Sequence, residues 1–310
     1  MAGHSKRHRT GNSLRFTGVY CDVRLISLLP LIVAASSNNP EAGTISVSGS
    51  VAILRVESPR PLDSAAVTVA ETYHWVINAE DPPYACADDL KDISSSQFRQ
   101  AYPGRKLLIP KGGALEVSYR VPPNGEPLNP EPVLRQIVST YNSHFPFRYR
   151  VETQGDVYSF VPEVGRNSAC KPVSIARLLD MRMSIPKTAT DAQDMFTLLG
   201  RALSKTTGLH VSCGFGIFDN GLAQTPVVVE ATGERARDVL LRMTKSIGYR
   251  MQWLERSDPT DGVWMINMQY LTREVERCGI PTREILRWPG VPQFRQVPEP
   301  PPRRPCPPER

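Results

Sequence analysis

Internal repetition is the feature of this 310-residue chain that most restricts its fold. A helical pattern followed by two strand patterns runs through residues 133–161, and the same order recurs at 239–267. The helices and the closing strands of the two copies align at an offset of 106 residues, and the strands between them at 102. These differences fall in loops, where changes of length cost little. We therefore expect two similar structural units.

Hydrophobic periodicity predicts the type of each element in the repeat. Apolar residues three and four apart predict helices, the first of which begins after Asn129, a good helix start before proline. In the second copy, alternation over 179–185 predicts a strand that ends at Pro186. Residues 190–193 form a capping box and open a helix that ends at Gly208. Each copy is thus predicted as β-α-β-β-α-β-β.

These elements predict an α+β fold of two tandem small modules, with helices packed between small sheets. The first module spans residues 51–170 and carries an inserted loop at 80–113, which the second module, residues 171–282, lacks. A linker at 36–50 precedes the modules. A Pro/Arg-rich tail at 283–310, disordered or extended as polyproline II, follows them.

Residues 1–35 have the layout of a secretory signal peptide. A basic stretch precedes an apolar run that begins at Leu25, and Val33 and Ala35 suit cleavage before Ser36. The run is shorter than the about 20 residues of a spanning helix. We expect a periplasmic or secreted protein, whose membrane contact, if any, is through an uncleaved signal anchor. The long basic stretch leaves two options, a start codon assigned too early or such an uncleaved anchor, and the alternative to a signal is a short buried strand after a disordered arm.

Widely spaced cysteines in an exported chain indicate disulfides. Cys86, Cys170, Cys213 and Cys278 are the candidates, and they permit three sets of pairs. We favour Cys86–Cys170 and Cys213–Cys278, because each pair takes a similar place in its copy of the repeat; geometry has to confirm this choice. Cys306 in the tail is left as an unpaired thiol.

The charge distribution argues against a nucleic-acid partner. The net charge is +6, but residues 1–35 hold five basic residues against one acidic, and residues 283–310 hold six against three. The body between them is nearly neutral, so it lacks the basic surface that supplies most non-specific affinity for nucleic acid.

A family resemblance rests on the second copy. It contains the segment VVVEATG at 227–233, a helix that ends at Gly248 and a closing hairpin. With these features residues 179–268 resemble the short N-terminal domain shared by bacterial secretins and TonB-dependent receptors, and residues 51–162 resemble it more weakly. The resemblance implies two helices between two small sheets and contact with another envelope protein. It brings no catalytic residue.

No catalytic, metal or cofactor site is predicted. The chain has no Gly-x-Ser-x-Gly elbow and no His-Glu-x-x-His helix. The carboxylate pairs at 80–81 and 88–89 are interpreted as solvated groups or a helix start in preference to calcium ligands. The alternative function is an extracytoplasmic, hydrolase-like enzyme with a site between the modules, for which His74, Asp81 and His210 have to converge.

The favoured function is protein binding or scaffolding in the bacterial envelope, with a periplasmic or outer-membrane protein as partner. The expected contacts are the last hairpin of each module and the loop at 80–113. The candidate contact residues of the hairpins are Tyr158, Phe160, Trp264 and Ile266. For the same four residues we prefer the interpretation that they pack in the core under the helices.

Overall fold

The order of strands and helices follows the repeat in the computed structural model, which describes residues 43–123, 126–215, 225–277 and 280–289. The first half of the chain forms β1 (Thr44–Ser48), β2 (Val51–Ser58), α2 (Pro61–Tyr73), β3 (Val76–Glu80), η1 (Ala87–Asp89), β4 (Leu90–Asp92), α3 (Ser96–Ala101), β5 (Leu108–Pro110), β6 (Gly113–Arg120), α4 (Pro130–His144), β7 (Arg148–Gln154), β8 (Val157–Arg166) and β9 (Pro172–Ser174). The second half forms η3 (Leu178–Asp180), β10 (Arg182–Asp191), α5 (Ala192–Thr207), β11 (His210–Phe215), β12 (Pro226–Arg235), α7 (Ala236–Ile247), β13 (Met251–Ser257), β14 (Val263–Tyr270), β15 (Thr272–Arg277) and β16 (Ile280–Ile285).

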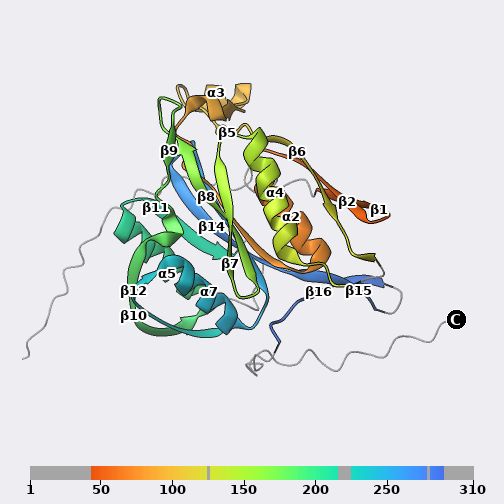
Figure 1. Ribbon diagram of the computed structural model, residues 1–310. Coiled ribbons are helices and arrows are strands. Elements are labelled where there is room, and N and C mark those ends of the chain that lie inside the picture. The colour runs from red at the N-terminus through yellow and green to blue at the C-terminus, as the bar shows by residue number, and fades with distance from the viewer. Residues whose placement is uncertain (1–42, 124–125, 216–224, 278–279, 290–310) are drawn as a thin grey trace, which may run out of the picture. The chain divides into compact units, whose positions relative to one another are not determined.

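Helices pack between sheets, and the fold is α+β (Figure 1). α2 contacts β2 of the sheet β1-β2-β6 and β3 of a larger sheet, and α4 contacts β6 and β7 of the same two sheets. In the second half α5 contacts β10 and β11, and α7 contacts β12. The helix faces that were predicted to be apolar are buried, for example Ala66 and Val69 on α2 and Leu240 on α7. Burying an aliphatic side chain of this size contributes about 1.5–3 kcal/mol.

The two halves repeat one order of strand pairing. β2 pairs antiparallel with β6, while β3 pairs parallel with β8, which pairs antiparallel with β7. In the second half β10 pairs antiparallel with β12, while β11 pairs parallel with β14, which pairs antiparallel with β13. The repeat in the sequence therefore reappears as a repeat in topology.

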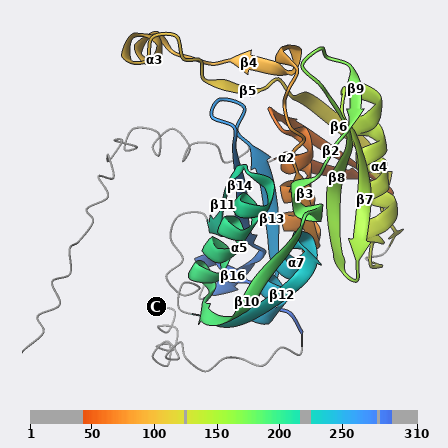
Figure 2. The same cartoon turned by 90° about the vertical axis from the view of Figure 1, so that its left-hand side faces the viewer.

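The expected separation into two modules is not confirmed, because the halves share a sheet (Figure 2). β13 pairs parallel with β3, with Leu254 opposite Ala79 and Glu255 opposite Glu80. The strands β11-β14-β13-β3-β8-β7, with β9 beside β8, form one seven-stranded sheet of the described residues. Every residue of β3 is buried, as is typical of a central parallel strand. The side chain of Asn78 strengthens this junction, since its Oδ1 accepts from the Trp253 backbone N–H at 3.0 Å.

The junction between the halves contains a buried group of charges. Arg237 of α7 donates to both carboxylate oxygens of Glu80, with 2.9 Å between Nη2 and Oε2, and lies 3.2 Å from Asp180. Glu255 is 2% exposed, and its Oε2 has no hydrogen-bond partner among the described residues. Burial, and then the charge of Glu80, raise the pKa of Glu255 well above that of an exposed glutamate. Burial also raises the pKa of Glu80, although Arg237 opposes the shift.

Two local predictions in the second half need correction. β10 runs past Pro186, and its ladder with β12 is irregular between Ile185 and Thr188, so the proline without an N–H lies at a break in the pairing. The helix cap of α5 is Asp191, whose carboxylate accepts from the Asp194 backbone N–H at 2.8 Å, and not Thr190.

The ends of the predicted modules also differ from expectation. Residues 44–48, placed in the linker, form β1 and pair with β2. Residues 283–289, placed in the tail, include the end of β16 and the buried Trp288, whose backbone N–H donates to Gly248 O at 3.1 Å. The predicted signal peptide at 1–35 lies outside the described residues. Among the residues that are described, no helix has the length and apolar character to cross a membrane.

Candidate functional site

An open cavity of about 280 Å³ lies in the first half, where the inserted loop returns to β6. Its walls come from the start of α2, the two ends of the insertion, the end of α4 and the start of β7. The lining is rich in aromatic residues, prolines and carboxylates: Pro59, Arg60, Pro61, Leu62, Asp63, Asp81, Tyr84, Asp88, Asp89, Pro110, Lys111, Gly112, Tyr141, His144, Phe145, Pro146, Phe147 and Tyr149. A concave surface with a few convergent polar groups is the usual form of a binding site.

Glycine at position 112 lets the insertion close against β2. Its φ is +52°, and a Cβ there would lie 2.1 Å from Ser58 O and 2.5 Å from the Pro59 backbone. The returning strand therefore approaches the start of α2 more closely than any residue with a side chain permits. This contact forms one wall of the cavity.

Aromatic side chains form another wall. Tyr84 packs edge-on against Phe147 with ring centroids 5.5 Å apart. Tyr141 stacks on Phe145 at 4.5 Å and meets Tyr149 edge-on at 5.2 Å. Burial raises the pKa values of Tyr84, Tyr141 and Tyr149, so all three stay neutral hydroxyl donors at physiological pH. The wall offers ring faces and hydroxyl groups, and no negative charge of its own.

Asp81 anchors the base of the cavity to the second half. It accepts from Arg60 Nε at 2.7 Å, from the Tyr84 hydroxyl at 3.1 Å and from the Ser257 backbone N–H at 3.1 Å. Arg60 also donates to Ser257 O at 2.9 Å, and its guanidinium lies 6.0 Å from the centre of the Tyr84 ring. The charges of Asp81 and Arg60 are therefore paired with each other.

Asp63, at the first turn of α2, has an unusual protonation equilibrium. Its carboxylate accepts from Arg256 Nε at 2.9 Å. Burial, which outweighs this arginine, together with the charge of Asp81 raises the pKa of Asp63 to about 6. Asp63 can therefore change its charge under mildly acidic conditions.

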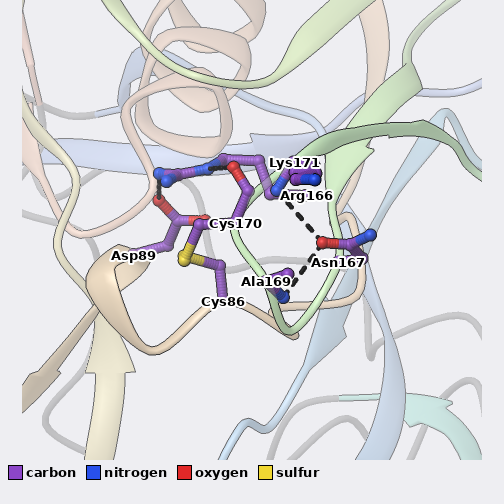
Figure 3. Close-up of a disulfide and its surroundings, with 7 residues drawn as sticks. All are labelled: Cys86, Asp89, Arg166, Asn167, Ala169, Cys170 and Lys171. Atoms are coloured by element: carbon purple, nitrogen blue, oxygen red, sulfur yellow. Dashed lines mark hydrogen bonds and ion pairs between the residues drawn. A yellow bond between two sulfur atoms is a disulfide. The ribbon is translucent and has the colours of Figure 1, made fainter.

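A disulfide between Cys86 and Cys170 holds the far side of the cavity, as predicted (Figure 3). Arg166 bridges the two segments that the disulfide joins, since it donates to Asp89 Oδ1 at 2.7 Å and to Cys170 O at 3.0 Å. Asp89 is 7% exposed, and its second oxygen, Oδ2, has no hydrogen-bond partner in the part of the chain that the structure describes. The neighbouring Asp88 is exposed and carries a second carboxylate at the same wall.

A metal site at this wall is not compatible with the disulfide. Cys86, Asp88 and Cys170 are the group of potential ligands that comes close together among the described residues, with ligand atoms within 4.8 Å of one another. Cysteine binds a metal as the thiolate, and the sulfurs of Cys86 and Cys170 are bonded to each other. Asp88 and Asp89 remain at this wall as carboxylates that line the cavity.

The second predicted disulfide, Cys213–Cys278, is not tested by the structure. Cys213 is a buried thiol without a disulfide to any described residue, and its predicted partner Cys278 lies outside those residues. By strand register Cys213 takes the place of Ala79, because His210 and Val76 begin equivalent ladders. Cys86 lies seven residues beyond Ala79, in the insertion, so the two cysteines are not equivalent. Cys213 instead packs against α5, where a Cβ at Gly200 would lie 3.4 Å from its own.

The predicted contact residues of the two hairpins pack mainly in the interior. Phe160 and Ile266 are buried in the core, Trp264 is 8% exposed, and Tyr158 is half-buried against the core. Their burial agrees with the preferred interpretation, core packing, and leaves little surface for a partner. The loop at 80–113, the third expected contact, contributes directly to the cavity.

The groups required for the enzymatic alternative do not converge. His74 and Asp81 lie before and after β3, so about 20 Å separates them at about 3.3 Å per residue. His210 begins β11, which β14 and β13 separate from β3 by about 14 Å at about 4.8 Å per strand. Asp81 is instead occupied by Arg60, Tyr84 and the Ser257 N–H.

The acidic pairs of the insertion are less solvated than expected. Glu80, Asp81 and Asp89 are buried, and Asp88 is exposed. The alternative of a helix start holds for the second pair, which lies in η1. Sequence reasoning missed the aromatic wall, because its members come from three separate elements. The available signal was local: two adjacent aspartates, at 88 and 89, lie two and three residues after Cys86.

Comparisons with known proteins assign no relative: no family model, no curated protein and no solved structure matches the chain.

Proposed function

We propose that the protein is a protein-binding module of the bacterial envelope that holds a basic side chain of its partner in the cavity beside the disulfide. The observation that carries this proposal is Asp89 Oδ2, a buried carboxylate oxygen of a cavity-lining residue, to which no donor among the described residues is bound. Leaving such an acceptor unsatisfied costs about 1–3 kcal/mol. A ligand that brings an N–H donor into the cavity recovers this free energy.

Arginine is the side chain that suits the cavity best. Its planar guanidinium binds carboxylates through parallel N–H groups and also stacks on aromatic rings. The cavity offers both kinds of group, with Asp88 and Asp89 on one side and Tyr84 and Phe145 among the aromatic residues of another. A cation over an aromatic face contributes about 0.5–2 kcal/mol, depending on desolvation. Arg60 does not compete for Asp89, because Asp81 and Ser257 O hold it.

The envelope location in this proposal rests on three features. The Cys86–Cys170 disulfide is typical of proteins in oxidising compartments. Residues 1–35 have the layout of a secretory signal. The resemblance of residues 179–268 to a domain of secretins and TonB-dependent receptors adds a periplasmic or outer-membrane protein of a secretion or signalling assembly as the kind of partner.

A titration with a minimal ligand tests the proposal. The probe is acetyl-prolyl-arginine methylamide, and its neutral control carries citrulline, which keeps the shape and loses the charge. We expect saturable binding of the arginine probe with a Kd on the order of 1 mM, about −4 kcal/mol, and at least tenfold weaker binding of the citrulline probe. Nuclear magnetic resonance shifts of the full chain report both.

Three variants locate the binding. Asp89→Asn is expected to abolish the interaction, and Asp88→Asn, at an exposed position that carries little of the fold, to weaken it several-fold. Glu71→Gln removes an exposed carboxylate on α2 outside the cavity lining and serves as the matched control. Equal affinity for arginine and citrulline, or unchanged binding by both aspartate variants, would contradict the proposal.

A further inference from the structure

We infer that the cavity also binds the Pro/Arg-rich segment at 298–308 of the same chain, with Arg303 or Arg304 directed at Asp88 and Asp89, so that this segment competes with the partner. The inference rests on the proposed function, because it uses the same cavity. It adds a regulatory occupant that the chain itself supplies.

The chemistry of the segment matches that of the cavity. Residues 300–308 contain six prolines and two adjacent arginines and no acidic residue. Proline-rich segments adopt polyproline II and dock in grooves lined by aromatic side chains, with little ordering entropy to lose. The cavity supplies tyrosine and phenylalanine rings, and its unpaired acceptor is a carboxylate oxygen. Opposite charge and complementary shape thus occur in one chain.

The segment can reach the cavity from the place where the described chain stops. Trp288 donates to Gly248 O, so the chain leaves the fold near the start of β13. The other end of β13 is Ser257, whose carbonyl accepts from Arg60 at the cavity. β13 spans about 23 Å at about 3.3 Å per residue. The fourteen residue steps from Pro289 to Arg303 cover about 43 Å in polyproline II at about 3.1 Å per residue.

Covalent attachment makes even a weak contact effective. A tethered ligand whose linker spans the distance has an effective concentration in the millimolar range. A segment with an affinity of about 0.1 mM would then occupy the cavity in about nine molecules out of ten. The partner must displace the segment, and its apparent affinity falls about tenfold in consequence.

The test measures the affinity of a free copy of the segment for full-length chains. The probe is a fluorescein-labelled peptide of residues 298–310 with serine in place of Cys306, followed by fluorescence polarisation. The first chain is native, and the second carries Arg303→Glu and Arg304→Glu. A third chain, with Arg295→Glu and Arg310→Glu, makes the same change in net charge at other positions of the tail.

We expect the peptide to bind the Arg303→Glu, Arg304→Glu chain about tenfold more tightly than it binds the native and control chains. When Asp89→Asn or Asp88→Asn is added to that chain, we expect this gain in affinity to be lost. Equal affinity for all three chains, with binding still sensitive to the aspartates, would overturn the inference and leave the proposed function standing. No binding of the peptide to any chain would overturn the inference alone. Binding of the peptide that ignores both aspartate substitutions, together with an arginine probe that ignores them as well, would overturn the inference and the proposed function together.

Discussion

Replacing Glu255 by glutamine is expected to stabilise the protein at pH 8 and to leave its stability nearly unchanged at pH 4. Glu255 is buried opposite Glu80, and one buried arginine, Arg237, already holds Glu80. The ionised Glu255 thus adds a charge whose Oε2 has no donor. Removing the cost of such an unsatisfied group gives about 1–3 kcal/mol. Glutamine keeps the shape and carries no charge.

The pH dependence separates this explanation from a change in packing. Because the pKa of folded Glu255 is raised, the folded chain keeps a proton that the unfolded chain releases above about pH 4.3, the ordinary value for glutamate. The free energy of unfolding therefore falls as the pH rises through this range, by at most about 1.4 kcal/mol per pH unit for one group. The variant lacks this contribution, so its advantage grows with pH until folded Glu255 ionises.

Urea unfolding followed by tryptophan fluorescence at pH 4, 6 and 8 measures the effect, since Trp253 is buried on the same strand. Glu57→Gln, at an exposed position of β2, is the control and should change little at any pH. Glu80→Gln is expected to do the opposite and to lose about 3–5 kcal/mol, because it leaves Arg237 buried without its main partner. A Glu255→Gln variant that is less stable at pH 8, or whose advantage is the same at every pH, would refute the explanation.

Two further predictions concern the walls of the cavity. Reducing the Cys86–Cys170 bond, which joins residues 84 positions apart, should lower the free energy of unfolding by about 2–5 kcal/mol. It should also weaken binding of the arginine probe, since Asp89 loses its fixed position. Unfolding and titration with and without reductant measure the two effects, and unchanged curves would contradict the role of the bond. Gly112→Ala should lower the free energy of unfolding by more than about 2 kcal/mol, measured by thermal unfolding, because the new Cβ meets Ser58 O. Gly104→Ala is the control, since Gly104 also has a positive φ but no described atom lies within 4 Å of the new Cβ, and it should cost only about 1 kcal/mol. Equal losses would show that the contact with Ser58 O does not add to the cost.

Elements whose information is local were predictable from the sequence. The stripes of α2, α4, α5 and α7 and the alternation of the strands identified most of the repeat, and the helix starts after Asn129 and near Asp191 followed from side chains that cap the backbone. The Cys86–Cys170 disulfide is confirmed, but the matched place in the repeat from which it was predicted is not, because Cys213 takes the place of Ala79 and not that of Cys86.

The shared sheet was not predictable, because it depends on few and distant contacts. The ladder between β3 and β13 has two residue pairs, separated in the chain by 175 positions. Polar residues such as Asn78 and Glu80 also make the central strand hard to recognise in the sequence. Asn78 binds Ser159 of the first half and the Trp253 backbone N–H of the second half, and Glu80 binds Arg237 of the second half. No periodicity in the sequence reports such partners.

The cavity lies where the repeat is broken, and this is the physical basis for assigning function to it. The insertion after β3 has no equivalent after β11, and it supplies Asp88, Asp89 and the cysteine that holds them. The second half holds two residues of the cavity wall in place, because the Ser257 backbone N–H donates to Asp81 and the Ser257 carbonyl accepts from Arg60. Loosening the pairing of β13 with β3 is therefore expected to disturb the cavity even though no residue of β13 lines it. The repeated strands and helices of the two halves pack together through the shared sheet. The insertion at 80–113 is fixed to them, and its carboxylates are therefore held in place more firmly than those of a solvated loop.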